Sequence, residues 1–380
     1  MCSPSFKPPT LPSPVRTLSR AALWLALAAA CVLVQSACPS DEDTDVDKDT
    51  SEDTGVSDDT SDGMDGSDVE PDPDTAPDTS IVGTLDDILR LNHLQLMGTH
   101  NSYHQRGEVV IHPTHDYSHL SLSAQLDLGV RAFEIDIHNP ESLVEADDYA
   151  VYHITVLDPG SSCLSLKACL GAVVAWSDAN PFHVPIAIWI EPKGDAGGFA
   201  IEDLPRLDTV IAGVVPEGKR ITPASVQGAR ASLREALTLD GWPTLADSRG
   251  KIIFALLDTE APRDVYTESL TKVMERLVFV GAKASEFNED WAGVAKINNP
   301  GDAAIADAHA ANILVASNIC TAGEEDDVPC REATAAAEAN GSQWLKTDYP
   351  EAEGNPYSFT LAPSCNPVTA PTECIDGAVE

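Results

Sequence analysis

LQLMGTHNSY (residues 94–103) and GVRAFEIDIH (residues 129–138) are the two segments that decide the fold of this chain. Each contains an apolar run and ends in polar side chains, among them histidine, asparagine and carboxylates. Short apolar runs bounded by polar residues predict buried strands. We therefore expect two strands of a parallel sheet, with polar side chains gathered where each strand ends.

Apolar runs of similar length recur along the rest of the chain. Strands are predicted at residues 94–98, 130–137, 149–154, 184–190, 220–222, 251–257, 312–316 and 343–347. Helical patterns lie between several of them, at 121–128, 202–210, 229–237, 266–278 and 331–339. About eight strands alternating with helices predict an α/β fold, a (β/α)8 TIM-type barrel. An open doubly wound sheet is the alternative, but no GxGxxG motif follows the first strand.

The first 38 residues have the pattern of an export signal. Three basic residues precede an apolar run at 21–34, which is too short to span a bilayer comfortably. Cys38 follows VQSA and resembles the cysteine of a bacterial lipobox, although Gln35 stands where leucine is usual. We expect an exported cell-surface or periplasmic lipoprotein that contacts the membrane through a lipid anchor. Cleavage without lipidation, which would give a secreted protein, is the alternative.

An acidic segment separates this signal from the predicted domain. Residues 39–80 hold 17 acidic residues and one lysine, and the whole chain has a formal net charge of −38. Because this segment has too little apolar surface to offset the entropy lost on folding, we predict a disordered, extended linker. Residues 81–380 are long enough for one barrel domain and still carry a net charge of about −25. This negative charge argues against a nucleic-acid partner. We also expect the protein to be a monomer.

The cysteines of the predicted domain also point to export. Six cysteines form three pairs close in sequence: Cys163 with Cys169, Cys320 with Cys330, and Cys365 with Cys374. An even number in an exported chain predicts disulfides, although six cysteines allow 15 connectivities. A zinc site is the alternative, but no CxxC occurs.

Oxygen-bearing side chains end three of the predicted strands. Asn101 follows the first, Glu134 and Asp136 lie in the second, and Glu191 ends the fourth. The carboxyl ends of parallel barrel strands meet at one face, which holds the active site of such barrels. An amide and three carboxylates suit calcium, with magnesium as the alternative. Each carboxylate taken alone has a simpler interpretation, a salt bridge with a residue such as Arg131.

Two histidines accompany these oxygen ligands. His100 follows the first predicted strand, and His153 lies in the third. A lone histidine is usually structural, whereas a pair beside a carboxylate cluster can divide proton transfer and charge stabilisation around a phosphorus atom. Further histidines crowd the loop after the first strand. They are His104, His112, His115 and His119, and they either form a polar loop over the barrel mouth or bind a second metal ion.

These motifs together resemble the calcium-dependent phosphoinositide-specific phospholipases C, in their bacterial group. The first segment, LQLMGTHNSY, is similar to the first catalytic segment of that family, and GVRAFEID has its G-x-R-x-x-E-x-D spacing. Further similarity lies in VYH at 151–153, in WPTL at 242–245 and RGK at 249–251, and in TDYP at 347–350. The resemblance covers roughly residues 90–350 and implies a phosphoric diester hydrolase on a TIM-type barrel.

The resemblance also implies roles for these residues. His100 is expected to stabilise charge on the phosphoryl oxygens, and His153 to protonate the leaving alcohol. Asn101, Glu134, Asp136 and Glu191 are expected to hold calcium, and one of the carboxylates to serve as base. The substrate is expected to be a phosphatidylinositol-type lipid, cleaved to diacylglycerol and an inositol cyclic phosphate that water then opens.

Three further residues and one segment bear on the site and on substrate binding. Lys193 and Arg131 are candidates for contacting the substrate, although Lys193 alternatively pairs with Glu191 or Asp195. Asp348, at the end of the last strand, either orients a site histidine or caps a turn. The segment at 316–320 lacks the arginines that the resemblance leads us to expect there. We therefore expect a cationic contact to the head group to be missing.

Two other functions remain open on the sequence. A glycerophosphodiester phosphodiesterase shares the barrel, the metal and the histidine pair, but that class usually has His-Arg-Gly where this chain has His-Asn-Ser. A non-catalytic surface binding protein is the third possibility, against which the intact His100 and His153 argue.

Overall fold

The computed structural model describes residues 85–139, 145–193, 199, 203–323, 327–350 and 357–380. The predicted export signal, Cys38 and the acidic linker lie outside these residues, as does Asp195. Among the described residues, none of the helices is both long enough and apolar enough to cross a membrane.

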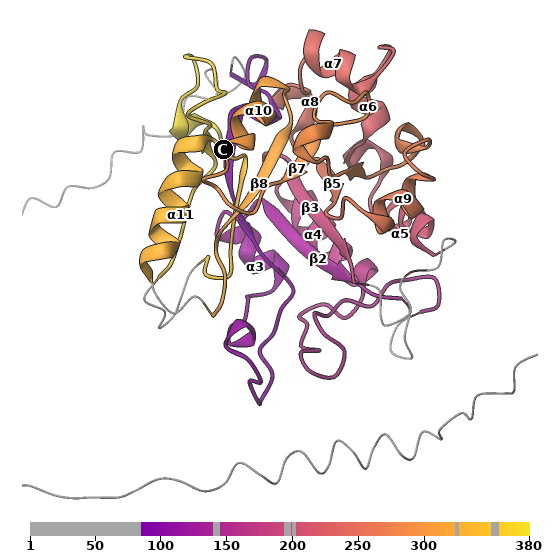
Figure 1. Cartoon of the computed structure of the whole chain (residues 1–380), viewed down its shortest axis with the longest axis vertical. Coiled ribbons are helices and arrows are strands. Elements are labelled where there is room, and N and C mark those ends of the chain that lie inside the picture. Colours follow the sequence, from indigo (N-terminus) through magenta and orange to yellow (C-terminus); the bar gives the residue numbers. More distant parts are fainter. Residues whose placement is uncertain (1–84, 140–144, 194–198, 200–202, 324–326, 351–356) are drawn as a thin grey trace, which may run out of the picture. The chain divides into compact units, whose positions relative to one another are not determined.

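A parallel sheet forms the centre of the described chain (Figure 1). Its strands are β1 Leu94–Thr99, β2 Ala132–Ile137, β3 Ile186–Pro192, β4 Arg220–Ile221, β5 Ile252–Leu256, β6 Phe279–Val280, β7 Val294–Lys296, β8 Leu314–Cys320 and β9 Trp344–Thr347. The pairing order is β4-β5-β3-β2-β1-β9-β8-β7, and β6 pairs with β5. A parallel bridge between Gly281 and Val294 links β6 to β7. The sheet thus curls round on itself, which confirms the predicted TIM-type barrel fold.

Helices surround this sheet in Figure 1. They are α3 Leu122–Asp127, α4 Leu166–Ala179, α5 Leu207–Val214, α6 Pro223–Gln227, α7 Leu233–Leu239, α8 Leu245–Ser248, α9 Ala261–Thr267, α10 Ala304–Ala310 and α11 Asp327–Asn340. Short 3-10 turns are η1 Leu91–His93, η2 Pro113–His115, η3 Leu204–Arg206, η4 Glu217–Lys219, η5 Val273–Glu275, η6 Ala284–Glu286 and η7 Asp376–Ala378. The short strand β10 Ser364–Cys365 runs antiparallel to the start of β1.

Alternation along the strands divides the core into two parts. Phe133 and Ile135 of β2 point outward and pack with the apolar faces of the helices. Ala132 points inward, into a separate apolar cluster that contains Trp189 and Trp344. The inward face of β2 then changes from apolar Ala132 to ionisable Glu134. The barrel is therefore apolar at its amino-terminal end and polar at its carboxyl-terminal mouth.

Gly98 of β1 is required by the tight interior. A β-carbon at this position would lie 2.9 Å from the Cβ of Ala132 and 2.9 Å from the Cγ of Lys346. Since such contacts are far shorter than van der Waals distance, only glycine lets a lysine side chain cross the barrel here. Gly98 thus makes room for one of the site residues described below.

The third predicted strand is wrong. Residues 149–154 run outside the sheet, where Ala150 forms isolated bridges with His138 and Ser165. The backbone of this segment hydrogen-bonds instead to the residues before α4, since Val151 N donates to Leu164 O at 3.1 Å. Tyr149 and Val151 are buried against the outer core, which explains their strand-like apolar pattern.

The sheet is completed by strands that the sequence analysis did not identify. Two strands, β6 and β7, replace the missing one, and both are very short. The predicted helix at 266–278 is also wrong, because the residues after α9 form turns and η5 before β6 begins. Ser269 and Leu270 there have φ angles of 57° and 67°, which are incompatible with a right-handed helix. Helix α4 was not predicted at all.

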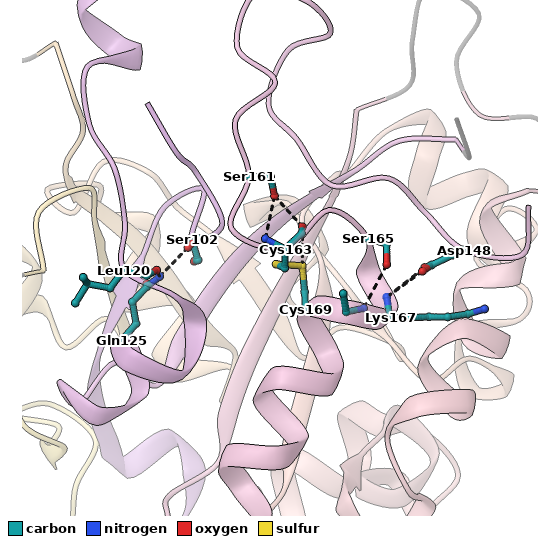
Figure 2. The surroundings of a disulfide bond; sticks show 10 residues. Ser102, Leu120, Gln125, Asp148, Ser161, Cys163, Ser165, Lys167 and Cys169 are labelled. Carbon is teal, nitrogen blue, oxygen red and sulfur yellow. Dashed lines mark hydrogen bonds between the residues drawn. A yellow bond between two sulfur atoms is a disulfide. The ribbon is translucent and has the colours of Figure 1, made fainter. Parts of the chain in front are cut away.

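The three local disulfides are confirmed. They join Cys163 to Cys169, Cys320 to Cys330 and Cys365 to Cys374. Figure 2 shows the first, which ties the loop before α4 to the first turn of that helix. Ser165 caps this turn, and Asp148 accepts a hydrogen bond from the backbone amide of Lys167 at 3.2 Å.

Candidate active site

The predicted metal ligands lie on strands that are neighbours in the sheet. Asp136 of β2 is in register with Glu191 of β3, and Glu134 lies two residues earlier on β2. Asn101 follows β1, and its neighbour Ser102 donates its backbone N–H to Glu134 O at 2.9 Å. The structure therefore brings the three predicted carboxylate ligands together at the carboxyl end of the barrel, and the backbone next to Asn101 is bonded to β2 beside them.

The three carboxylates form a compact cluster. Glu134, Asp136 and Glu191 each offer an oxygen within 4.8 Å of the others, and both β2 carboxylates are fully buried. Burial, together with the charges of Glu191 and Glu134, raises the pKa of Asp136 to about 8. The nearby charge of Lys193 opposes this increase but does not outweigh burial and the neighbouring carboxylates.

The donor atoms of this cluster fit a hard divalent cation. Asn101 Oδ1 and both oxygens of Asp136 are buried and receive no well-formed hydrogen bond from the described residues. Buried oxygens without hydrogen-bond donors are rare, because the lost hydration costs on the order of 1–3 kcal/mol each. An amide oxygen and three carboxylates are ligands that calcium prefers. The residues present thus suit the predicted calcium ion.

Lysines also enter the cluster, and two of them were not predicted. Lys296 Nζ lies 3.1 Å from Glu134 Oε2, and the ammonium group of Lys346 contacts the same oxygen. Although burial opposes ionisation, these two lysines hold the pKa of Glu134 well below its usual range. Burial lowers the pKa of Lys346 to about 7 despite this carboxylate partner.

Lys296 bears on one expectation from the sequence, the missing cationic contact to the head group. The segment at 316–320 lacks arginine, but Lys296 at the end of β7 places a cation at the site. Its side chain is 10% exposed, so it is accessible at the mouth. The sequence does contain a pattern that could have identified Lys296. Val294-Ala295-Lys296 is a short apolar run that ends in a polar residue, as the other strands of the site do.

Lys193 forms the ion pair that was its simpler interpretation. Its Nζ lies 2.7 Å from Glu191 Oε1 and 3.5 Å from Asp136 Oδ2. Burial acts to lower the pKa of Lys193, but the two carboxylates outweigh it and raise the pKa. Lys193 is therefore a charged group at the mouth of the barrel.

Arg131 is not at the site, and its prediction as a substrate contact is wrong. Its guanidinium group pairs with Glu380, donates to the backbone oxygen of Leu126 at 2.7 Å and stacks over Trp176. Arg131 precedes β2, so it lies at the opposite end of that strand from Asp136. The arginine of the G-x-R-x-x-E-x-D motif therefore stabilises the packing of this protein and does not contribute to the site.

His100 is held by a carboxylate at the mouth. Its Nδ1 lies 3.0 Å from Asp348 Oδ1, and its Nε2 faces Glu134 Oε1 at 3.7 Å. Burial acts to lower the pKa of His100, but Asp348 and Glu134 together raise it above its usual value. Asp348 also accepts a hydrogen bond from the backbone amide of Ala322 at 2.7 Å. Asp348 thus orients His100, as one interpretation of the sequence suggested.

His153 has an analogous partner on a loop. Its Nδ1 lies 2.8 Å from Asp158 Oδ2, and Asp158 also contacts His104 Nε2 at 2.9 Å. Burial lowers the pKa of His153; the charge of Lys193 adds to the decrease, and Asp158 opposes it. This loop protrudes at the foot of Figure 1, beside the loop that follows β1. Asp158 was missed because it lies five residues after the histidine in an irregular segment.

Two cavities are lined by residues that follow β7 in the chain. One, of about 320 Å³, is lined by Lys296 among others, and the second, of about 390 Å³, is lined by Asn318 among others. Both are bordered by Asn298 and Asn299. The side-chain oxygen of Asn318 is buried and accepts no hydrogen bond within the described chain. The larger cavity is thus lined by neutral amides, whereas Lys283, Lys296 and Asp302 also line the smaller one.

Comparison with protein families supports the sequence resemblance. The family model of calcium-dependent phosphoinositide phospholipase C matches residues 89–142 and 138–363. A comparison with curated protein sequences gave no match.

Two solved bacterial structures have a fold similar to that of this chain. A calcium-dependent phosphoinositol-specific phospholipase C from a Pseudomonas species has 20% sequence identity and a TM-score of 0.50, over 68% of this chain and 90% of that chain. A Ca²⁺-dependent phosphatidylinositol-specific phospholipase C from Streptomyces antibioticus has 19% identity and a TM-score of 0.51, over 68% of this chain and 95% of that chain. At this level of identity the similarity concerns the fold.

Proposed function

This chain belongs to the calcium-dependent phosphoinositide phospholipase C family of phosphoric diester hydrolases, and we propose that it cleaves phosphatidylinositol-type lipids to diacylglycerol and an inositol cyclic phosphate. One observation carries the proposal: two histidine–carboxylate pairs accompany a cluster of three carboxylates at the mouth of the barrel. A phosphodiester needs positive charge beside it and a proton for its leaving group, and this arrangement offers both.

The proposed reaction begins with the inositol hydroxyl next to the phosphate. Its oxygen attacks phosphorus, its proton passes to a carboxylate of the cluster, and the bond from phosphorus to the diacylglycerol oxygen breaks. His153 donates a proton to that leaving oxygen, and Asp158 stabilises the imidazolium form before the transfer. Water then opens the cyclic phosphate in a second step.

His100 is proposed to stabilise the charge that develops on the phosphoryl oxygens. Because Asp348 engages Nδ1, Nε2 is left to face the carboxylate cluster. The raised pKa keeps more of the ring in the cationic form than a free histidine would have at neutral pH. Calcium bound by Asn101, Glu134, Asp136 and Glu191 would neutralise the phosphate and lower the pKa of the attacking hydroxyl.

The lysines are proposed to bind phosphate as well. Lys193 and Lys296 are held by carboxylates at the mouth, where an anionic substrate can share them. The larger neighbouring cavity is lined by Asn298 and Asn318 without a charged residue among its described lining, and these amides match the hydroxyl groups of an inositol ring better than further phosphates. We therefore propose that the preferred head group is inositol without additional phosphates.

Exposed apolar side chains support a lipid substrate. Two loops at the mouth, residues 104–120 and 154–165, carry a group of them. The group comprises Val109, Ile111, Leu120, Val156, Leu157 and Leu164, each more than half exposed. Apolar side chains on loops around an active site would enter the interfacial region of a bilayer. A lipid anchor at Cys38 and an exported location also remain part of the proposal, and the disulfides fit an oxidising compartment.

Turnover of defined lipids tests the proposal. We expect vesicles of phosphatidylinositol to be cleaved, phosphatidylinositol bisphosphate and glycerophosphoinositol to be poorer substrates, and a calcium chelator to stop the reaction. Phosphorus NMR would reveal the cyclic phosphate as the first product. Preference for the glycerophosphodiester would favour the second enzyme class, and lipid binding without turnover would favour a binding protein.

Substitution of the two histidines completes the test. His100→Ala and His153→Ala should each lower turnover by roughly 10²–10⁴-fold. His112→Ala is the matched control, because this histidine is exposed and its ring contacts Thr114 by a hydrogen bond. Wild-type turnover in either of the first two variants would exclude the proposed mechanism.

A further inference from the structure

We propose that this protein has a second metal site, separate from the carboxylate cluster, in which His115, His153 and Asp158 bind a zinc-type transition-metal ion. The ligand atoms of these three residues all lie within 4.8 Å of one another. Two come from the loop that carries His153, and the third comes from η2 in the loop after β1. We call this group the loop site.

The geometry of the loop site already points its donor atoms at one another. Asp158 Oδ2 lies 2.8 Å from His153 Nδ1 and 3.9 Å from His115 Nδ1. The two imidazole rings stand edge-to-face with their centroids 5.4 Å apart. Three donors that converge around one point need only small side-chain rotations to reach metal–ligand distances of about 2.0–2.2 Å.

His115 is the residue whose surroundings need an explanation. Its Nδ1 is buried and has no hydrogen-bond partner among the described residues, although its ring is 13% exposed. A buried ring nitrogen costs free energy when it lacks a partner. A metal ion shared with His153 and Asp158 would satisfy this nitrogen.

A second layer of contacts fixes the carboxylate of the loop site. His104, fully buried, lies with its Nε2 2.9 Å from both oxygens of Asp158. Its Nδ1 contacts the backbone oxygen of Tyr117 at 3.0 Å, and its ring stacks on that of Tyr117. Outer partners of this kind orient metal ligands and raise affinity. Asp158 is thus held in place before any ion arrives.

The donor set identifies the class of ion. Two imidazole nitrogens and one carboxylate oxygen suit Zn²⁺ and similar transition metals, and they leave one position open for water. Calcium prefers oxygen ligands and has such a set in the carboxylate cluster. The protein would therefore separate two kinds of ion between two neighbouring sites.

Occupancy of the loop site would affect catalysis, and this consequence rests on the proposed function. An ion at the loop site takes Nδ1 of His153 and Oδ2 of Asp158, and so it replaces their mutual hydrogen bond. His153 could then no longer be charged as an imidazolium and would lose its role as general acid. Zinc would act as an inhibitor that does not compete with calcium.

Metal titration of the untagged full chain tests the proposal. With calcium in excess, calorimetry with ZnCl₂ should show one site per chain, and CoCl₂ should produce the visible absorption bands of a tetrahedral ion. His115→Ala should weaken zinc binding by more than about tenfold, since loss of an outer partner alone costs 10–100-fold. His112→Ala should bind as the wild type does, because its ring is a near neighbour of His115 outside the site.

Turnover measured in the same samples separates this proposal from the proposed function. Zinc should inhibit the wild type and His112→Ala, whereas His115→Ala should keep basal turnover and need at least tenfold more zinc for inhibition. Zinc binding without inhibition would support the loop site and contradict the role of His153. Absence of zinc and cobalt binding in the wild type, or unchanged zinc affinity in His115→Ala, would overturn the loop site. His115→Gln, checked by circular dichroism, replaces His115→Ala if the latter does not fold.

Discussion

The two histidine–carboxylate pairs of the mouth are built on different supports. His100 and Asp348 follow strands β1 and β9, which pair along four residues of the sheet. His153 and Asp158 belong to one loop that leaves the sheet and is tied at its end by the Cys163–Cys169 disulfide. The first pair is positioned by the barrel itself, and the second depends on loop contacts.

The two histidines also differ in electrostatic environment. Two carboxylates raise the pKa of His100, whereas burial and Lys193 lower the pKa of His153. His100 is therefore biased towards keeping its charge, whereas His153, once protonated, is the stronger acid and gives up its proton more readily. Such a difference allows two chemically identical side chains to take different roles. It also predicts that damage to the strand-borne half and to the loop-borne half will have different consequences.

Removal of Asp136, the buried carboxylate of β2, should have the largest effect. Asp136→Asn should lower turnover by roughly 10²–10³-fold, because the charge that balances the cation is lost. The same change should stabilise the calcium-free protein. The pKa of Asp136 is about 8 in the fold and 3.8 ordinarily, so its stability contribution is complete below pH 3.8 and is lost as pH rises towards 8.

Thermal unfolding with and without calcium measures this prediction. At pH 8 without calcium, Asp136→Asn should be more stable than the wild type by roughly 2–5 kcal/mol. Calcium should raise the melting temperature of the wild type and have little effect on the variant. A variant that is both less stable and still activated by calcium would exclude Asp136 as a ligand.

The loop-borne carboxylate should matter next. Asp158→Asn should lower turnover by about 10–100-fold, as loss of an orienting partner does, with calcium affinity unchanged. Asp348→Asn should lower turnover similarly and also reduce the free energy of unfolding by about 1–2 kcal/mol, since Asp348 accepts the Ala322 amide. Steady-state kinetics and denaturant unfolding check both variants. An equal loss of calcium affinity in Asp158→Asn and Asp348→Asn would contradict the functional separation of the strand-borne pair from the loop-borne pair.

A buried histidine beside His100 should give a pH-dependent effect. His119, in the loop after β1, donates from Nε2 to the backbone oxygen of His100 at 2.8 Å. Burial lowers its pKa to about 4, so the stability it contributes is complete above pH 6.5 and is lost as pH falls towards 4. His119→Gln should remove up to about 3 kcal/mol of this loss. Unfolding free energies at pH 6.5 and 4.5 should converge in the variant; an unaltered pH slope would refute the assignment.

Opening the loop disulfide should have the smallest effect. Cys163→Ser with Cys169→Ser should lower turnover by only a few-fold, because the loop keeps its hydrogen bonds to Asp158. Cys365→Ser with Cys374→Ser is the matched control, since this bridge lies at the start of β1, away from the mouth. Turnover and calcium affinity are the readouts, and a greater loss of turnover in the control would contradict the comparison.

The strand-borne half was predictable from the sequence. Glu134 and Asp136 alternate with Phe133 and Ile135, and side chains of a strand alternate between its two faces. Since parallel strands end at one face of a barrel, His100, Asn101 and Glu191 were expected beside them. Lys296 escaped because β7 spans only Val294–Lys296, too short for a clear alternating pattern.

The loop-borne half was predicted only in part. His153 was identified through its resemblance to a family motif, but the segment around it was taken for a strand. Tyr149 and Val151 have the apolar alternation of a strand because they bury against the outer core. Periodicity reports burial and does not report which partner provides it, so the true position of this segment depended on the fold.

The sequence by itself predicted the barrel, indicated disulfides between cysteines close along the chain, and showed oxygen-bearing side chains at the strand ends. These depend on local alternation and on short sequence separations, which a single chain records directly. Tertiary structure alone decided that Arg131 packs against Glu380, that Lys296 and Lys346 engage Glu134, and that Asp158 joins three histidines. Such contacts join residues from separate elements or loops without a repeating pattern, so they arise only when the chain closes into its barrel.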